Sequence, residues 1–264
     1  MNIAQKILSD SNILSSLKHL MWEAGDVIID IYNNEKIDIT TKKDQSPVTK
    51  ADLAAHNVLI QGLSKLTPEI PVVSEEDPAS LAIPETVSVY WLIDPLDGTK
   101  EFINRNGQFT CNLALIESHK PTLGFVGIPV KDELYIGGDG IQSIREKRGS
   151  SSTEEQIHCS RISADLTRVV ASKSHLNAET EAFINSLEGD VELVQAGSSL
   201  KFLKIATGEA DIYPRLAPTC EWDTAAAHAV LEGAGGSITQ SSGSPMVYGK
   251  RDILNPYFIA KGHR

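Results

Sequence analysis

The sequence predicts a layered α/β fold with mixed sheets, divided into two closely packed halves. Apolar side chains recur at helical spacing over residues 12–33, and short β-rich runs separated by Gly, Pro and Asn begin at residue 70. Later in the chain, strand-like runs alternate with helical patterns, and such elements pack as layers. At 264 residues the chain is long enough to bury a substantial core, as one large domain or two fused halves.

The first half opens with helices and continues with strands. The apolar stripe from Leu14 to Ile31 predicts the first helix, and a second helix is expected over about 50–66. Between them, residues 42–50 are polar, contain Pro47 and predict a loop. Either Thr49 or Asp52 stands near the start of the second helix. The β-rich runs predict strands over 71–74, 87–93, 109–116 and 122–130.

The second half follows a polar stretch over 145–155 that contains three consecutive serines. This stretch is the best candidate for a boundary or a mobile surface loop. We therefore expect an N-terminal α/β half over 1–150 and a C-terminal α/β half over 151–264. In the second half, the patterns predict strands over 167–172 and 190–195, and helices over 178–187, 199–207 and 223–233.

Composition excludes several classes of protein. The chain carries 24 Lys and Arg against 35 Asp and Glu, a net charge of −11, which argues against a nucleic-acid partner bound through a broad basic surface. Three widely spaced cysteines suggest neither a disulfide framework nor a zinc site. No targeting peptide or transmembrane segment is recognisable. We expect a cytoplasmic protein and leave open a peripheral association with the inner face of the cell membrane.

Two carboxylates end a hydrophobic run in the segment Asp94-Pro-Leu-Asp97. Pro95 and Gly98 turn the chain so that both carboxylates, together with the backbone carbonyl of Leu96, can face one point. Hard oxygen ligands on a tight turn suit Mg²⁺. The alternative is that Asp94 and Asp97 are ordinary turn residues, because Asp, Pro and Gly dominate turns in any case.

Two further acidic residues stand at the ends of predicted elements. Glu75 follows the apolar run 72–74, and Asp223 precedes an Ala-rich helix. Acids at three element ends, far apart in sequence, are what a site assembled between elements needs. Alternatively, Asp223 only interacts with the dipole at the N-terminus of its helix.

These residues resemble a known family. Asp94-Pro-Leu-Asp-Gly-Thr99, with Ser74-Glu-Glu76 upstream and Trp222-Asp-Thr-Ala225 downstream, is similar to the lithium-sensitive, magnesium-dependent phosphatase superfamily of inositol monophosphatases. The longer strings Asp94 to Phe102, Ser74 to Pro78 and Gly197 to Phe202 resemble its 3′(2′),5′-bisphosphate nucleotidase branch, of the bacterial CysQ type. The resemblance implies a layered α-β-α-β-α sandwich with mixed sheets.

The resemblance also implies metals and a catalytic set. It assigns Glu75, Asp94 and the Leu96 carbonyl to one Mg²⁺, and Asp94, Asp97 and Asp223 to a second, with a third ion held more weakly. Asp52 and Thr99, together with Glu75, match the residues that orient and deprotonate the attacking water, so no covalent phosphoenzyme is implied. The alternative for Asp52 is that it only caps a helix together with Thr49.

The family match suggests a set of substrate contacts on both halves. Singly, His175 could as well be a surface or capping residue, and Lys201 and Arg215 could be solvated charges. Lys201 is expected one turn into a helix whose N-terminal amides favour anions, and Arg215 can bind phosphate with a bidentate fork. Phe202 and Tyr213 are expected in the core. The substrate-binding set implied by the resemblance is Gly98, Thr99, Lys100, His175, Ser198, Lys201, Arg215 and Asp223.

The function implied by the resemblance is hydrolysis of adenosine 3′,5′-bisphosphate to AMP and phosphate, and of its 5′-phosphosulfate relative, which would clear a by-product of sulfate assimilation. One alternative is an inositol monophosphatase or another sugar-phosphate phosphatase. The other is an inactive metal- or nucleotide-binding sensor. The intact set of Asp52, Thr99 and the metal ligands argues against a sensor, which would not need a pair that activates water.

Overall fold

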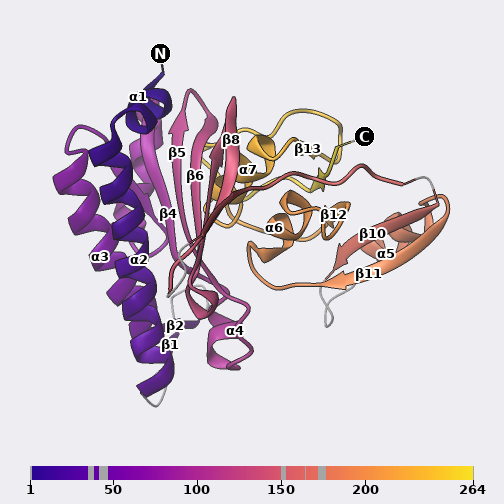
Figure 1. Cartoon of the computed structure of the whole chain (residues 1–264), viewed down its shortest axis with the longest axis horizontal. Coiled ribbons are helices and arrows are strands. Elements are labelled where there is room, and N and C mark those ends of the chain that lie inside the picture. The colour runs from indigo at the N-terminus through magenta and orange to yellow at the C-terminus, as the bar shows by residue number, and fades with distance from the viewer. Residues whose placement is uncertain are drawn as a thin grey trace.

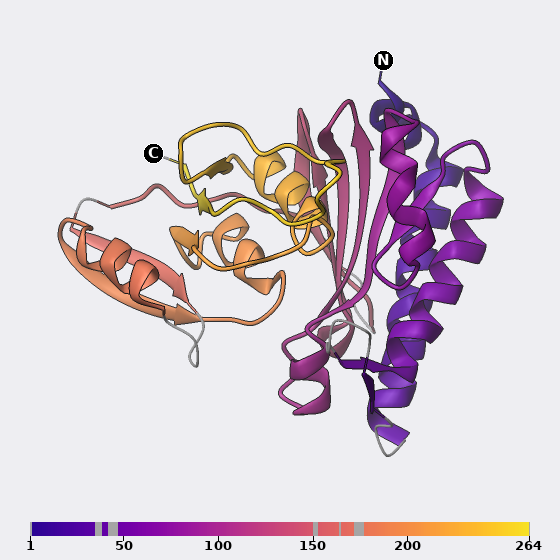
Figure 2. The same cartoon turned by 180° about the vertical axis from the view of Figure 1, so that it is seen from behind.

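Helices and sheets alternate as layers in a computed structural model of the chain (Figure 1). The structure describes residues 2–34, 39–41, 47–149, 153–163, 165–171 and 177–263. Helices α1 to α3 form one outer layer, followed by a seven-stranded sheet, a layer with α6 and α7, a five-stranded sheet, and α5 at the far side (Figures 1 and 2). This arrangement confirms the predicted layered α/β fold with mixed sheets.

The outer helical layer covers one face of the seven-stranded sheet (Figure 2). Leu17 and Ala24 of α2 and Leu59 of α3 are fully buried in a core that also contains Trp91 and Ile93 of the sheet. The two long helices match their predicted ranges closely, because a continuous apolar stripe spaced for a helix has one simple way to be buried. The bounds are α1 Ile3–Ser9, α2 Ser11–Asn34 and α3 Lys50–Leu66.

The seven-stranded sheet has its strands in sequence order, β3 to β9. Strand β3 runs parallel to β4, and every later pair is antiparallel. Side chains of β4 alternate between two cores: Trp91 faces the outer helices, whereas Leu92 packs in the core that contains α7. The bounds are β3 Val72–Ser74, β4 Val89–Asp97, β5 Thr110–Glu117, β6 Lys120–Ile128, β7 Glu133–Gly138, β8 Ile141–Lys147 and β9 Thr153–Gln156.

The second half contributes the inner helices and the five-stranded sheet. Its strands lie in the order β11-β10-β12-β14-β13, with parallel pairing among the first three and antiparallel pairing among the rest. Helix α7 is buried along most of its length against the seven-stranded sheet. The bounds are β10 Leu166–Ala171, α5 Ala178–Asn185, β11 Asp190–Gln195, α6 Leu200–Ala206, β12 Ile212–Arg215, α7 Ala225–Gly233, β13 Ser237–Gln240 and β14 Phe258–Lys261.

Short elements complete the chain. The strands β1 and β2 pair as a small antiparallel ribbon just before α3, and α4 follows directly on β4. The predicted loop over 42–50 therefore includes a strand at its end, while residues 42–46 lie outside the described part. No described helix is long and apolar enough to cross a bilayer. The bounds are β1 Ile39–Thr41, β2 Pro47–Thr49, η1 Pro78–Glu85, α4 Thr99–Ile103 and η2 Pro129–Lys131.

The prediction of a loop over 145–155 was wrong for most of that range. Residues up to 147 belong to β8, and β9 begins at residue 153 and pairs with β8. Polar side chains hold this hairpin in place: Lys18 of α2 forms ion pairs with Glu146 at 2.7 Å and Glu154 at 3.1 Å. The expected boundary at 150 falls beside residues outside the described part, and β9 beyond it still belongs to the first sheet.

Candidate active site

The end of β4 brings Asp94 and Asp97 to one point through a β-bulge. Asp94 is paired with Asn112 of β5, and Asp97 is paired with Thr110, so two residues of β4 face one residue of β5 between these pairs. The backbone N–H of Leu96 donates to the carboxylate of Asp94 at 3.1 Å. The bulge thereby places both carboxylates and the Leu96 carbonyl in one short segment, as the sequence predicted.

Glu75 reaches the same place from the neighbouring strand. In the parallel pair, Ser74 of β3 is aligned with Ile93 of β4, and the Glu75 N–H donates to the Ile93 carbonyl at 3.3 Å. The next residue on each strand is an acid, so Glu75 lies beside Asp94 and their carboxyl groups interact directly. The parallel register explains why two segments that are distant in sequence supply adjacent acids.

Asp223 enters from the second half, on the turn before α7. Its carboxylate accepts a hydrogen bond from the Cys220 N–H at 2.8 Å, which fixes it against its own turn. Carboxylate oxygens of Asp94, Asp97 and Asp223 all lie within 4.8 Å of one another. Three of the four predicted acidic ligands thus form one compact group, and Glu75 adjoins it through Asp94.

The side chain of Asp97 is held by a dense set of donors. Its Oδ2 accepts from the Ser198 hydroxyl at 2.5 Å, the Ser199 N–H at 2.7 Å and the Ser199 hydroxyl at 3.0 Å. Thr110 and Asn112 approach the same oxygen at 3.5 Å. These donors fix the orientation of the Asp97 carboxylate.

The carboxylates of the acidic group repel one another, and a bound cation would relieve this repulsion. Burial raises the pKa of Asp94, and the charges of Glu75, Asp97 and Asp223 raise it further. Burial and the charge of Asp97 likewise raise the pKa of Asp223, against a lowering by the Cys220 N–H. Clustered carboxylates that repel one another are stabilised in their ionised form by a bound divalent ion. A set made only of hard oxygen donors fits Mg²⁺, so the residues present fit the implied metal.

Beside this group, Asp52 and Thr99 form the second predicted pair. The Thr99 hydroxyl donates to Asp52 Oδ1 at 3.1 Å and lies 3.5 Å from the Leu96 carbonyl. The other oxygen of Asp52 accepts from the Thr49 N–H at 2.8 Å and its hydroxyl at 2.6 Å, as part of a capping box at the start of α3. Asp52 is therefore both a helix cap and the hydrogen-bond partner of Thr99, and its role in activating water stays a prediction.

A cavity of about 210 Å³ opens beside the acidic group and carries basic side chains. Asp97 and Asp223 line it together with Lys201 and Arg215. Lys201 is buried, its ammonium group donates to the Ser198 carbonyl at 3.2 Å, and it lies 5.6 Å from the centre of the Tyr213 ring. The expectation that Lys201 could be a solvated charge was wrong, because α6 turns its second residue inward.

Arg215, at the end of β12, is partly exposed. One of its terminal nitrogens donates to the Pro218 carbonyl at 2.7 Å, while its Nε is buried without a hydrogen-bond partner among the described residues. Arg215 lines the same cavity as Asp223, and its charge acts to lower the pKa of Asp223. A guanidinium group that lines a cavity is suited to an anionic ligand.

The other predicted substrate contacts differ in where they lie relative to the cavity. Gly98 lines the cavity and adopts a left-handed φ of 94°, and a side chain there would meet Ser198 Cβ at 3.3 Å. Lys100 is exposed and does not appear among the described residues that line the cavity. His175 lies outside the described residues. The core assignments of Phe202 and Tyr213 are confirmed by their burial, although both also reach the cavity wall.

Several residues that hold the site were not predicted. Ser199, Thr110 and Asn112 surround Asp97, and the Asn112 amide also donates to the Ser199 hydroxyl at 3.0 Å. Glu101 lines the cavity from α4. For Ser199 the signal was present, because it lies inside the Gly197 to Phe202 string that was singled out. For the two β5 residues nothing in a strand of mostly apolar residues marks the position opposite the bulge.

The chain is similar to known proteins along most of its length. A family model described as the inositol monophosphatase family matches residues 9–262. The 3′(2′),5′-bisphosphate nucleotidase CysQ of Escherichia coli O6:H1 is 45% identical over 248 residues, which are 93% of this chain and 98% of the relative. The CysQ protein of Escherichia coli K12 is 44% identical with the same coverage.

Solved structures show the same fold. The crystal structure of CysQ from Bacteroides thetaiotaomicron has a TM-score of 0.84 and 38% identity, covering 97% of this chain and 99% of that chain. The SuhB protein of Bartonella henselae, at 21% identity, has a TM-score of 0.76 with 96% and 94% coverage and supports the fold alone. On the evidence of the family model, the chain belongs to the inositol monophosphatase family.

Proposed function

We propose that this chain is a Mg²⁺-dependent 3′(2′),5′-bisphosphate nucleotidase that hydrolyses the 3′-phosphate of adenosine 3′,5′-bisphosphate to give AMP and phosphate. The observation that carries the proposal is the shared cavity, in which Lys201 and Arg215 stand beside the acidic group. A substrate with two phosphates can place one at the acids and the other at the basic side chains. The named activity of the bacterial relatives supports the same assignment.

The acidic group would hold two metal ions, with a third bound more weakly. Glu75, Asp94 and the Leu96 carbonyl would hold one ion, and Asp94, Asp97 and Asp223 the second. Bound Mg²⁺ would lower the pKa of a water and stabilise the charge that develops on the leaving oxygen. No covalent intermediate with the protein is needed, because the attacking group is water.

Asp52 and Thr99 would take the proton from that water. The Thr99 hydrogen is committed to Asp52, so the lone pairs of the Thr99 oxygen are free to accept a hydrogen bond from the water. Burial raises the pKa of Asp52, against the lowering effect of its hydrogen bonds from Thr49 and Thr99. A raised pKa favours uptake of a proton relayed through Thr99. Glu75, beside Asp94, completes the set.

Substrate selection would depend on the second half of the chain. The guanidinium group of Arg215, which lines the cavity, can bind phosphate oxygens, and Lys201 supplies a buried positive charge. Ser198 and Gly98 also line the cavity, and His175 and Lys100 stay predicted contacts. The 5′-phosphosulfate relative presents an anion at the same position and would be a second substrate.

An inositol monophosphatase is the alternative favoured by the family as a whole. Such an enzyme would use the same acidic group, but its substrate has no second phosphate for Lys201 and Arg215 to bind. The sensor hypothesis is weaker, because a protein that only binds metal or nucleotide needs no pair that activates water, although Asp52 also caps α3.

The proposed compartment is the cytoplasm, and the three cysteines, all of which are free, are consistent with reducing conditions. Peripheral contact with the inner face of the cell membrane stays a prediction.

Product analysis tests the activity. The protein is incubated with adenosine 3′,5′-bisphosphate in excess Mg²⁺ or in a chelator, and the nucleotide products are separated by chromatography. We expect AMP that carries its phosphate on the 5′ oxygen, formed only with the metal. Formation of the 3′-phosphate isomer, or no phosphate release with any phosphomonoester, would contradict the proposal.

A further inference from the structure

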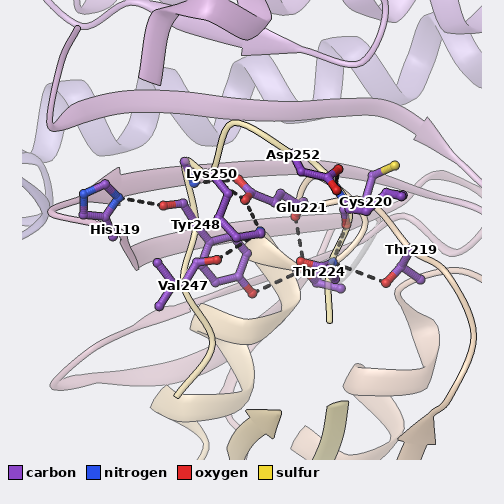
Figure 3. Close-up of polar contacts among 12 residues, drawn as sticks. His119, Thr219, Cys220, Glu221, Thr224, Val247, Tyr248, Lys250 and Asp252 are labelled. Carbon is purple, nitrogen blue, oxygen red and sulfur yellow. Dashed lines mark hydrogen bonds and ion pairs between the residues drawn. The ribbon is translucent and has the colours of Figure 1, made fainter. Parts of the chain in front are cut away.

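A buried ion pair lies directly behind the Asp223 turn and has no place in the catalytic set. Glu221 is only 1% exposed in its side chain, and Lys250, 28% exposed, forms an ion pair with it (Figure 3). The pair joins the turn before α7 to a loop near the C-terminal end, between β13 and β14. Figure 3 shows the two side chains directed toward each other across the space between the loop and the turn.

The loop also donates backbone hydrogen bonds to Glu221. The Gly249 N–H donates to Oε2 at 2.6 Å, and the Lys250 N–H donates to Oε1 at 3.1 Å. Gly249 has a left-handed φ of 76°, and a side chain there would meet the Tyr90 hydroxyl at 2.9 Å. The sequence therefore needs glycine at this position to bring the loop so close to Glu221.

Further hydrogen bonds join the loop to the turn before α7. The Asn255 amide donates to the Cys220 carbonyl at 2.6 Å and to the Thr224 hydroxyl at 3.1 Å, and its backbone N–H donates to the Thr219 carbonyl at 2.8 Å. The Glu221 N–H donates to the Ile253 carbonyl at 3.0 Å. Residues 219–224 are thus fixed to residues 249–255 on both sides of Glu221.

Asp223 depends on this turn for its direction. Its carboxylate is held by the Cys220 N–H at 2.8 Å, and its own N–H donates to the Cys220 carbonyl at 3.2 Å. That same carbonyl accepts from Asn255, so a shift of the loop moves the backbone that orients the carboxylate. Removing Lys250 would also leave the Glu221 charge buried without its ion-pair partner, which favours a rearrangement of the turn.

We infer that Glu221 and Lys250 are positioning residues that hold the Asp223 carboxylate in the direction needed for metal binding. This inference rests on the metal site proposed above. Outer partners of metal ligands commonly change metal affinity by about 10- to 100-fold when they are removed. The pair would act on metal affinity and leave binding of the nucleotide at saturating metal unchanged.

The test is direct metal binding by the full chain freed of metal. Free Mn²⁺, a divalent probe with a paramagnetic signal, is titrated against wild type, Lys250→Met and Lys250→Arg. We expect about a 10-fold or larger rise in the Mn²⁺ dissociation constant for Lys250→Met, and recovery of most of the affinity in Lys250→Arg. Lys204→Met is the matched control, because Lys204 of α6 is 30% exposed and its ion-pair partner is Glu209, which is not part of the Asp223 turn.

Activity gives the second readout. The Mg²⁺ concentration for half-maximal phosphate release should rise in parallel with the Mn²⁺ dissociation constant, while the KM for the nucleotide at saturating Mg²⁺ stays within twofold of wild type. If Lys250→Met does not fold, the double variant Glu221→Gln/Lys250→Met leaves no unpaired buried charge, and we expect it to show a smaller rise in the Mn²⁺ dissociation constant, of more than twofold, because the ion pair across the turn is lost.

The outcomes separate the two proposals. A wild-type protein that binds no Mn²⁺ would contradict the proposed metal site itself. A wild-type protein that binds Mn²⁺, together with a Lys250 variant whose affinity is within twofold of it, would overturn the positioning role alone. A fall in unfolding temperature with unchanged Mn²⁺ affinity would likewise show that the pair serves only the stability of the fold.

Discussion

The Thr99 hydroxyl donates a 3.1 Å hydrogen bond to Asp52, which stands 47 residues earlier in the chain. The bond connects the start of α4 to the start of α3, next to the bulge that carries the acidic group. It commits the hydroxyl hydrogen to Asp52 and leaves the oxygen lone pairs available. This orientation is the one that a relay from water to a carboxylate requires.

Thr99→Val removes the hydroxyl but keeps the volume of the side chain. Because general-base contributions are typically 10²- to 10⁴-fold, we expect kcat at saturating Mg²⁺ to fall by about two or more orders of magnitude. Thr99→Ser retains the hydroxyl and should keep most of the turnover. The measurement is the rate of phosphate release by the three proteins. A Val variant as active as the Ser variant would remove Thr99 from the mechanism.

Asp97→Asn tests the metal ligand without disturbing its donors. The Asn carbonyl oxygen can take the place of Oδ2 and accept from Ser198 and Ser199, which puts the amide NH₂ in the place of the other carboxylate oxygen. An NH₂ group cannot bind a cation, so most activity should be lost. The unfolding temperature without metal should be no lower than that of wild type, because one repelling charge is gone. Near-native turnover in Asp97→Asn would contradict the proposed metal site.

The choice of ion tests the geometry of the acidic group. Mg²⁺ requires near-octahedral coordination, whereas Ca²⁺ accepts a looser and larger shell that disturbs in-line attack. We expect phosphate release with Mg²⁺, little with Ca²⁺ as the sole divalent ion, and inhibition when Li⁺ is added in the millimolar range. Full activity with Ca²⁺ combined with indifference to Li⁺ would be incompatible with the proposed metal positions.

The ion pair between Asp211 and Arg168 lies outside the candidate site and leads to a prediction about stability. Burial alone would raise the pKa of Asp211, but hydrogen bonds from the Arg168 side chain and backbone and from Ser160 outweigh it, so the pKa is lowered. A lowered folded-state pKa stabilises the fold at neutral pH. This share of stability is lost as the pH falls below about 4, the ordinary pKa of Asp, toward the lower folded value.

Asp211→Asn should therefore lower the free energy of unfolding at pH 7 by roughly 3 kcal/mol, near the lower end for a broken buried ion pair. Between pH 5 and pH 2 the difference between variant and wild type should shrink. Denaturant titrations at several pH values measure this trend. A difference independent of pH would mean that the carboxylate charge contributes nothing.

The elements that could be predicted are those whose own side chains specify them. Helices α2 and α3 carry continuous apolar stripes, and β4 to β6 are hydrophobic on both faces. Strand β9 has no such pattern: all four of its residues, Thr153–Gln156, are exposed, and it forms because it pairs with β8. Strands β12 to β14 are only four residues long, so their pairing depends on segments brought together by the fold.

The site divides in the same way. The acids at strand and helix ends could be predicted, because carboxylates directly after apolar runs are conspicuous and their combination resembles a family. The residues that orient them could not: Thr110 and Asn112 matter because of the β4–β5 register, and Lys250 because a loop returns to Glu221. Such partners are set by tertiary contacts between distant segments, and no local pattern marks them.

In the proposed function, Arg215 and Lys201 make the cavity select a substrate with a second phosphate. The most direct measurement is kcat/KM for adenosine 3′,5′-bisphosphate and for inositol 1-phosphate, on wild type and Arg215→Ala at saturating Mg²⁺, with the exposed Arg251→Ala as the matched control.

We predict that wild type and the control prefer the bisphosphate. Because a charge-assisted contact is worth roughly 1.5–3 kcal/mol, Arg215→Ala should lower kcat/KM for the bisphosphate by about 10- to 100-fold. The same substitution should change kcat/KM for the monoester only a little. An equal fall in kcat/KM for both substrates, or a wild-type preference for inositol 1-phosphate, would show that Arg215 does not select a second phosphate.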